Sequence, residues 1–163
     1  MLYELATAAA RITEGSATRL LINDRSDIAA ASGAAGVHLT SSSLPTAVVR
    51  QAFGDEFVIG VSVHSLEEAT VARDSGADFA VFGPVFDTAS KREYGPALGV
   101  PALGRVASEL SPFPILAIGG VGLVNVGDCI AAGARGVAAI TMLGQPDTLA
   151  DVAEAIRQRT KID

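Results

Sequence analysis

The stretch that decides the fold is Ser32-Gly-Ala-Ala-Gly-Val-His-Leu39. Its plan recurs at Ser75-Gly-Ala-Asp-Phe-Ala-Val-Phe82 and at Ala132-Gly-Ala-Arg-Gly-Val-Ala-Ala139. In each copy a helical stretch ends at a Gly-Ala pair, and residues that favour β-structure follow. The glycine of each pair suits the left-handed conformation that closes a helix before a strand. The repetition predicts a chain of alternating helices and strands, and therefore a mainly parallel sheet.

Six strands and seven helices can be traced outward from these joints. Leu2, Leu5, Ala9 and Ile12 recur at helical spacing, so we expect the chain to open on a helix. Short apolar runs predict strands at residues 19–23, 36–39, 57–63, 79–83, 115–118 and 136–141. The stretches between them predict helices at about residues 24–32, 44–53, 66–75, 100–110, 124–132 and 149–159. We therefore expect a single α/β domain over residues 1–163.

The length of the chain limits how this fold can close. An eight-stranded barrel of strand–helix units needs at least about 200 residues, and this chain has 163. We therefore expect an incomplete TIM-type (βα) barrel with about six parallel strands. The two edge strands of such a sheet are apolar, and soluble proteins cover or pair such edges. Two arrangements would cover these edges: the six strands close on themselves, or two copies complete each other as a homodimer, which we expect.

Composition and charge exclude several classes of protein. The net charge is −6 and the pI is near 4.8, whereas general nucleic-acid binding needs a basic surface. Neither a signal peptide nor a membrane-spanning run is recognisable. The single cysteine, Cys129, lies in an Ala-rich helical stretch and is expected to be a small buried thiol. We expect a cytoplasmic protein without nucleic-acid or membrane partners; a small phosphorylated ligand remains compatible with this charge.

Polar residues follow several of the predicted strands, at the edge where such folds carry their chemistry. Asp24, after Asn23, has two interpretations: a Mg²⁺ ligand, since Mg²⁺ prefers oxygen, or a helix N-cap. His64 follows the strand at 57–63 and is either an acid–base group or a hydrogen-bonded structural residue. His38 lies inside an apolar strand, and we expect a structural role for it.

Two further segments favour phosphate binding. Gly119-Gly120 ends one predicted strand and opens a helix, where backbone N–H groups are available to an anion. Thr141 ends the neighbouring last strand, and phosphates are commonly held between the last two strand ends of barrel enzymes. Between residues 83 and 98 lies a long non-periodic segment with Thr88, Ser90 and Lys91, which suit phosphate oxygens. The alternatives are a tight turn and a solvated surface loop.

Taken together, these segments resemble the thiamine-phosphate synthase and thiazole tautomerase superfamily. The residues that carry the resemblance run in the family's order over almost the whole chain: Leu21-Ile-Asn-Asp-Arg25, Gly36-Val-His-Leu39, Gly60-Val-Ser-Val-His64, Gly83-Pro-Val-Phe-Asp-Thr-Ala-Ser-Lys91, Ala117-Ile-Gly-Gly120 and Gly133-Ala-Arg-Gly-Val137. The family's synthase joins a hydroxymethylpyrimidine diphosphate to a thiazole phosphate. The resemblance implies thiamine biosynthesis, a transferase activity and phosphorylated pyrimidine or thiazole ligands.

The resemblance also implies roles for individual residues. On the pyrimidine diphosphate side, Asn23, Ser62 and Lys91 match contacting positions, and Asp24 matches a Mg²⁺ ligand.

On the thiazole phosphate side, Thr88 and Ser90 match positions near the phosphate. Gly120, Ile140 and Thr141 match its cradle.

Three departures from the family pattern bear on activity. The family begins with two further strands, the second carrying cations that hold diphosphate, so we expect this barrel to lack its first two strands. The second Mg²⁺ ligand, an Asp in the family, falls on Ser43, whose neutral hydroxyl cannot replace a carboxylate. The acid–base His of the tautomerase falls on Pro84, which has no proton to transfer.

Three hypotheses for function follow from these matches and departures. The first is a thiamine-phosphate synthase-like transferase whose diphosphate and Mg²⁺ side is altered. The second is a non-catalytic binder of thiazole phosphate or thiamine phosphate. The third is a tautomerase-like enzyme that uses His64.

Overall fold

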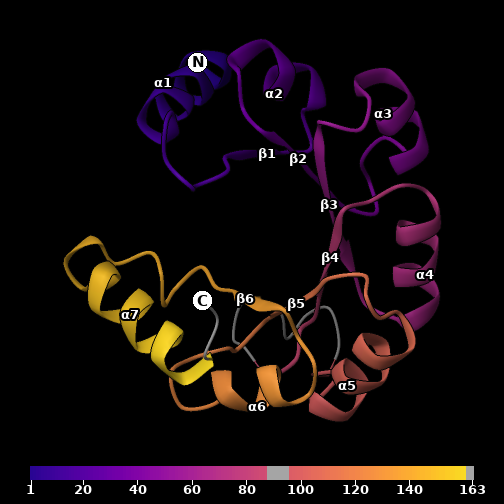
Figure 1. Ribbon diagram of the computed structural model, residues 1–163, viewed down its shortest axis with the longest axis vertical. Helices are drawn as coiled ribbons and strands as arrows, with labels where there is room; N and C mark the ends of the chain where they lie inside the picture. Colours follow the sequence, from indigo (N-terminus) through magenta and orange to yellow (C-terminus); the bar gives the residue numbers. More distant parts are fainter. Residues whose placement is uncertain (88–95, 161–163) are drawn as a thin grey trace. The chain divides into compact units, whose positions relative to one another are not determined.

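The computed structural model describes residues 1–87 and 96–160 of the chain, in which helices and strands alternate (Figure 1). The strands are β1 (Leu21–Asn23), β2 (Gly36–Leu39), β3 (Val58–Val63), β4 (Phe79–Phe82), β5 (Ile115–Ile118) and β6 (Gly136–Ala138). The helices are α1 (Leu2–Thr13), α2 (Ser26–Ser32), α3 (Thr46–Phe53), α4 (Leu66–Asp74), α5 (Val100–Glu109), α6 (Val126–Ala131) and α7 (Leu149–Thr160). A short 3-10 helix, η2 (Pro146–Thr148), precedes α7.

The predicted order of elements is confirmed. The strands follow one another in one six-stranded sheet in the order β1-β2-β3-β4-β5-β6. Strands β2 and β5 have the predicted bounds, but β6 ends at Ala138, three residues before the predicted end. Within the described part of the chain, no helix combines the length and apolar character that crossing a membrane requires.

The three Gly-Ala joints share one hydrogen-bond pattern. Gly33, Gly76 and Gly133 all have positive φ, at 77°, 90° and 99°. The alanine after each glycine donates its N–H to a carbonyl five residues back in the helix, over 3.0–3.1 Å. This is the bond by which a left-handed glycine closes a helix. The residue after that alanine donates to the preceding strand: Ala35 to Leu20, Asp78 to Ile59 and Arg135 to Ile115, each over 2.8–2.9 Å.

The contacts divide the chain into two compact units, residues 1–62 with 71–80, and residues 63–70 with 81–163. In the first unit, β1, β2 and β3 pair in parallel, with Leu21 opposite Gly36 and Gly36 opposite Val58. Its core gathers buried side chains from α1, α2, α3, β1, β2 and β3 and from Phe57.

The helix α1 packs against α2 (Figure 1) but leaves large apolar side chains exposed. Ala6 is its buried residue, whereas Leu5 is 67% and Ile12 83% exposed. The apolar spacing thus predicted the helix, but the large side chains that gave the spacing do not enter the core of this unit.

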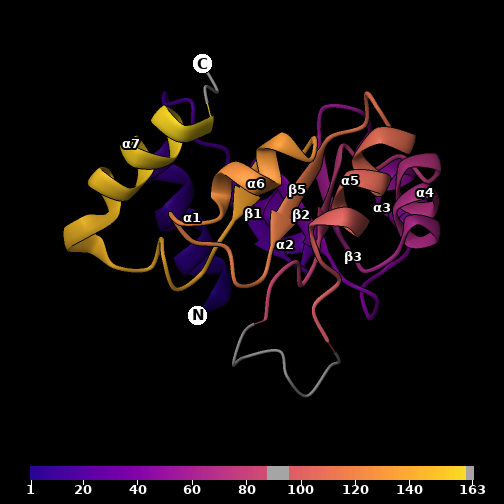
Figure 2. The same ribbon diagram turned by 90° about the horizontal axis from the view of Figure 1, so that it is seen from below.

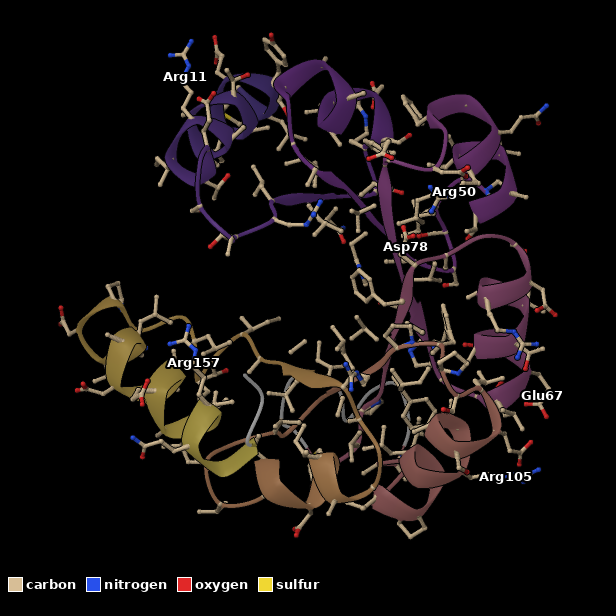
Figure 3. All side chains as sticks on the ribbon, viewed as in Figure 1. Arg11, Arg50, Glu67, Asp78, Arg105 and Arg157 are labelled. Atoms are coloured by element: carbon tan, nitrogen blue, oxygen red, sulfur yellow. The ribbon has the colours of Figure 1, made fainter. Side chains whose placement is uncertain are left out.

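Arg50, on α3, forms hydrogen bonds with the loops around it and points toward Asp78 (Figure 3). Its guanidinium donates to the backbone oxygens of Gly54, Phe57 and Gly76 over 2.7–2.9 Å. It also donates to Oδ2 of Asp78 over 2.8 Å, and that oxygen accepts the N–H of Ile59 over 2.6 Å. One side chain therefore satisfies three backbone acceptors and fixes the entry into β3 and β4.

The second unit has its own core around β5 and β6, which pair in parallel with Ala117 opposite Val137. Figures 1 and 2 both show α6 between α5 and α7. Cys129, on α6, is fully buried, and burial raises the pKa of its thiol. The predicted buried thiol is thus confirmed.

We predict that Arg50→Ala lowers the free energy of unfolding by about 2–4 kcal/mol, because several partly buried acceptors lose their donor at once. Urea unfolding followed by circular dichroism measures the change. Arg25→Ala is the matched control, since Arg25 pairs with Asp27 at the surface and such pairs contribute little. Equal unfolding midpoints for the two variants would contradict the assigned role of Arg50.

Candidate functional site

In the first unit, the carboxyl edge of the sheet brings together residues that the sequence had singled out. The register places Asn23 opposite His38, and His38 opposite Gly60. Because paired residues of neighbouring strands share a face and side chains alternate along a strand, Ser62 lies on that face too, two residues beyond Gly60. Asn23 and Ser62 therefore flank His38 on one face, near the ends of their strands.

His38 makes a side-chain contact with Ser62. Its Nε2 lies 2.8 Å from Oγ of Ser62. Burial lowers the pKa of His38, which favours a neutral ring. The structural role expected for His38 thus includes a direct hydrogen bond to a predicted site residue.

Asp24 has an unusual backbone conformation for a residue other than glycine. Its φ is +66°, in the left-handed region, which asparagine and aspartate tolerate better than most residues. Its N–H donates to the carbonyl of His38 over 2.8 Å. The interpretation of Asp24 as a helix N-cap is wrong, because α2 begins at Ser26 and its N-cap is Arg25. The left-handed turn moves Asp24 off the helix and onto the sheet edge.

A cavity of about 340 Å³ lies beside this turn, and both Asp24 and Ser43 line it. Arg25 and Asp27 line it as well, joined by two hydrogen bonds of 2.8 and 2.6 Å. The Arg25 guanidinium lowers the pKa of Asp27 to about 2. Asp27 is therefore a carboxylate already paired with a cation by two hydrogen bonds, whereas Asp24 interacts with Arg25 only through its charge.

The hydroxyl of Ser43 already has local partners. Its Oγ accepts the N–H of Thr40 over 2.8 Å and lies 3.2 Å from Oγ1 of Thr40. Within the described residues, no group of three His, Cys, Asp or Glu side chains converges as a metal site would require. This donor set fits a Mg²⁺ ion held by one carboxylate together with a ligand's phosphate oxygens and water, not an ion held by the protein alone.

In the second unit, His64 follows the last residue of β3 and is held by Glu68. The Oε2 atom of Glu68 accepts the backbone N–H of His64 over 2.7 Å and lies 3.2 Å from Nδ1 of its ring. Ser65 accepts the N–H of Glu68 over 3.1 Å and so caps the start of α4, while the Glu68 side chain reaches back to the residue before Ser65. A carboxylate can only accept, so a hydrogen bond between these two atoms requires the proton on Nδ1 of His64.

Gly119 and Gly120 lie against a neighbouring backbone. A Cβ on Gly119 would come within 2.6 Å of Cα of Pro84, and one on Gly120 within 2.7 Å of the carbonyl oxygen of Asp87. Phe86 donates its N–H to the carbonyl of Gly119 over 2.9 Å. Close approach of the chain therefore requires glycine here, independently of any ligand.

The helix expected to open at Gly119-Gly120 begins later. The helix α6 starts at Val126, after a turn in which Asn125 accepts the N–H of Gly122 over 2.8 Å and donates to the carbonyl of Gly120 over 3.0 Å. The expectation that a helix N-terminus faces a ligand at this pair is thus wrong. Asn125, which the sequence analysis did not single out, fixes the backbone there.

The remaining predicted site residues lie on the same unit or outside the described residues. Ile140 and Thr141 lie in the turn after β6 instead of on the strand, because β6 ends at Ala138, and both are exposed. Thr88, Ser90 and Lys91 lie outside the residues that the structure describes.

Comparison with known proteins decides the family. The model of the family described as thiamine monophosphate synthase matches residues 1–143. The chain belongs to this family. A thiamine-phosphate synthase of Methanospirillum hungatei is 43% identical over 150 residues, which are 91% of this chain and 72% of that protein. One of Methanoculleus marisnigri is 41% identical over 159 residues, 97% of this chain and 74% of the relative.

A solved structure of this synthase family supports the same assignment. Thiamine phosphate pyrophosphorylase from Pyrococcus furiosus superposes with a TM-score of 0.85 at 28% identity, covering 98% of this chain and 76% of that chain. The resemblance drawn from the sequence is confirmed, and so is the expected α/β partial-barrel class.

We predict that Gly119→Ala lowers the free energy of unfolding by at least about 2 kcal/mol. A side chain there must adopt a φ of +91° and would press on the backbone at Pro84. Gly122→Ala is the control, because a Cβ at Gly122 meets no atom within 4 Å. Thermal unfolding of both variants measures the difference, and similar melting temperatures would contradict the close approach.

Proposed function

We propose that this chain carries the transferase reaction of its family, joining a hydroxymethylpyrimidine diphosphate to a thiazole phosphate. The observation that supports this most is the placement of the residues matched to the pyrimidine diphosphate. Asn23 and Ser62 share one face of the sheet at its carboxyl edge, and Asp24 follows directly on the same edge. Three matched residues from two strands and the turn after one of them therefore belong to one compact unit.

In the proposed reaction the diphosphate leaves, and the resulting pyrimidine cation is trapped by the thiazole nitrogen. The carbon–oxygen bond to the diphosphate breaks with both electrons on oxygen, and a carbon–nitrogen bond forms from the nitrogen lone pair. The leaving diphosphate gains negative charge, so donors aimed at its oxygens stabilise the transition state. Asn23 supplies amide N–H groups, Ser62 a hydroxyl and Lys91 an ammonium group for this purpose.

The family is generally Mg²⁺-dependent. In this chain, we propose Asp24 as the protein carboxylate that would hold the ion, with the remaining oxygens coming from the diphosphate and water. When bound, the ion would offset charge on the departing diphosphate. Ser43 stands where the family has its second carboxylate, and its hydroxyl already accepts a hydrogen bond from Thr40. Mg²⁺ binding would therefore depend more strongly on Asp24.

The thiazole phosphate is proposed to bind to residues of the second unit. Gly119 and Gly120 expose backbone near a turn that Asn125 fixes, and Ile140 and Thr141 follow β6. Thr88 and Ser90 are proposed to contact the same phosphate by their match to the family. His64, whose ring Glu68 holds through Nδ1, is the acid–base group that the tautomerase-like alternative would use.

A second function, binding of thiazole phosphate or thiamine phosphate without catalysis, is favoured by the metal side of the site. Asp27 is paired with Arg25, Ser43 is bonded to Thr40, and no metal-binding group of three converges among the described residues. A protein that cannot bind Mg²⁺ together with the diphosphate would still be able to bind thiazole phosphate. A tautomerase role is supported less, because Pro84 stands at the position of that enzyme's acid–base His.

We predict Mg²⁺-dependent formation of thiamine phosphate by the purified chain, and a loss of about 10–100-fold in Asp24→Asn. Chromatography of the product measures the rate, and calorimetry measures Mg²⁺-dependent diphosphate binding independently of turnover. Asp27→Asn is the matched control, because its carboxylate lines the same cavity but is paired with Arg25. Binding of thiazole phosphate without any turnover would reject the transferase and favour the second function.

We also propose that the chain is a cytoplasmic homodimer. Strand β1 ends the sheet order and so has a single neighbouring strand, β2. The adjacent helix α1 exposes Leu5 and Ile12. A second copy that covers β1 and α1 would bury both the unpaired strand edge and these apolar side chains.

We predict a mass near twice 16.6 kDa by light scattering at micromolar concentration. Leu5→Asp combined with Ile12→Asp is expected to give a monomer, because two charges would be buried in the contact. Val71→Asp, at another exposed apolar residue on α4, is the control and should leave the dimer intact. A wild-type mass near 16.6 kDa would reject the homodimer.

A further inference from the structure

The hydrogen bond between His38 and Ser62 has a consequence for ligand binding that neither residue carries alone. The ring of His38 reaches from β2 to the hydroxyl on β3, with Nε2 2.8 Å from Oγ. A serine hydroxyl has a single proton and can accept as well as donate. Whichever partner supplies the proton between these two atoms therefore decides whether Ser62 has a proton left for a ligand.

An anionic ligand imposes one of the two directions. Phosphate and diphosphate oxygens accept hydrogen bonds, so Ser62 can bind them only by donating its proton. Its oxygen must then accept from His38. We propose that His38 is a positioning residue: as the tautomer protonated at Nε2, it donates to Ser62 and so directs the Ser62 proton to a phosphate or diphosphate oxygen of the ligand.

The surroundings of His38 support a fixed neutral ring. The register places Asn23 opposite it on β1 and Gly60 opposite it on β3. The ring of Phe79 occupies the space in which Gly60 would carry a side chain. This face therefore offers an amide on one side and an aromatic ring on the other, and neither brings a charge. Burial also lowers the pKa of the imidazole, which favours its neutral form.

This inference rests on the proposed function, because it takes Ser62 to contact the diphosphate of the substrate. It adds His38, which is not among the residues matched to the ligands, and it specifies the direction in which the Ser62 hydroxyl donates its proton. It further requires that the contribution of His38 to binding pass entirely through Ser62. That requirement can be tested with a double-mutant cycle.

The binding test uses inorganic diphosphate, titrated by calorimetry near pH 8 with Mg²⁺ present. We expect His38→Leu and Ser62→Ala each to weaken binding about tenfold, as the loss of one hydrogen bond to an anion predicts. The double variant should bind no more weakly than either single one. His38→Gln should recover most of the affinity, because its amide N–H₂ can donate to Ser62. Affinities are compared only among variants that unfold at the same urea concentration as the wild type, because these variants are folded equally well.

The outcomes separate this inference from the function on which it rests. If the wild-type chain does not bind diphosphate, the proposed function fails on its pyrimidine side. If wild type binds and His38→Leu binds equally well, or if the two single losses add in the double variant, the role of His38 is overturned while the function stands.

Nitrogen NMR of the chain saturated with diphosphate gives a readout of the tautomer that does not depend on the measured affinity. The chain has two histidines, His38 and His64, so each single substitution assigns the spectrum. Long-range proton–nitrogen correlations should show His38 protonated at Nε2, and Ser62→Ala should shift that nitrogen without moving the signals of His64. A His38 ring protonated at Nδ1 alone would overturn the proposal.

Discussion

The Gly-Ala joint is the constraint on which the rest of the structure depends. At Gly33, Gly76 and Gly133 a left-handed residue ends a helix, and the alanine after it closes the last helical turn with a hydrogen bond to a carbonyl five residues back. The next residue then bonds to the preceding strand. One three-residue unit thus ends a helix, reverses the chain and sets a strand in parallel register. Arg50 adds to the second joint by donating to the carbonyl of Gly76.

The joints also decide where chemistry can occur. They lie at the amino ends of their strands and use their backbone groups in closing helices and pairing strands. The carboxyl ends carry no such repeated joint, so their residues vary: a left-handed Asp24 after β1, a His64 held by Glu68 after β3 and a glycine pair after β5. This division explains why Asn23 and Ser62, both matched to the pyrimidine diphosphate, fall at the carboxyl edge in the first unit.

The features that depend on residues close together in the sequence, such as the helices and strands, could be predicted from the sequence. The repeated joint predicted the alternation of helices and strands, and β2 and β5 have the predicted bounds. The exposure of Ile12 was not predictable, since helical spacing says that apolar residues share a face but not what covers it. The left-handed Asp24 depends on its bond to the carbonyl of His38, which is a contact between strands. The link from His38 to Ser62 depends on register in the same way.

The electrostatics of the sheet edge explain why hydrogen-bond direction matters in this chain. A net charge of −6 opposes the approach of a diphosphate, and at this edge the Arg25 guanidinium is already paired with Asp27. In the proposed site, Asn23 and Ser62 would attract the anion with neutral dipoles, whose value depends on which way they point. An amide always has N–H groups to donate, but a hydroxyl donates to a ligand only if another group supplies its oxygen with a proton. A neutral His38 provides that proton without adding a charge that the buried strands would have to accommodate.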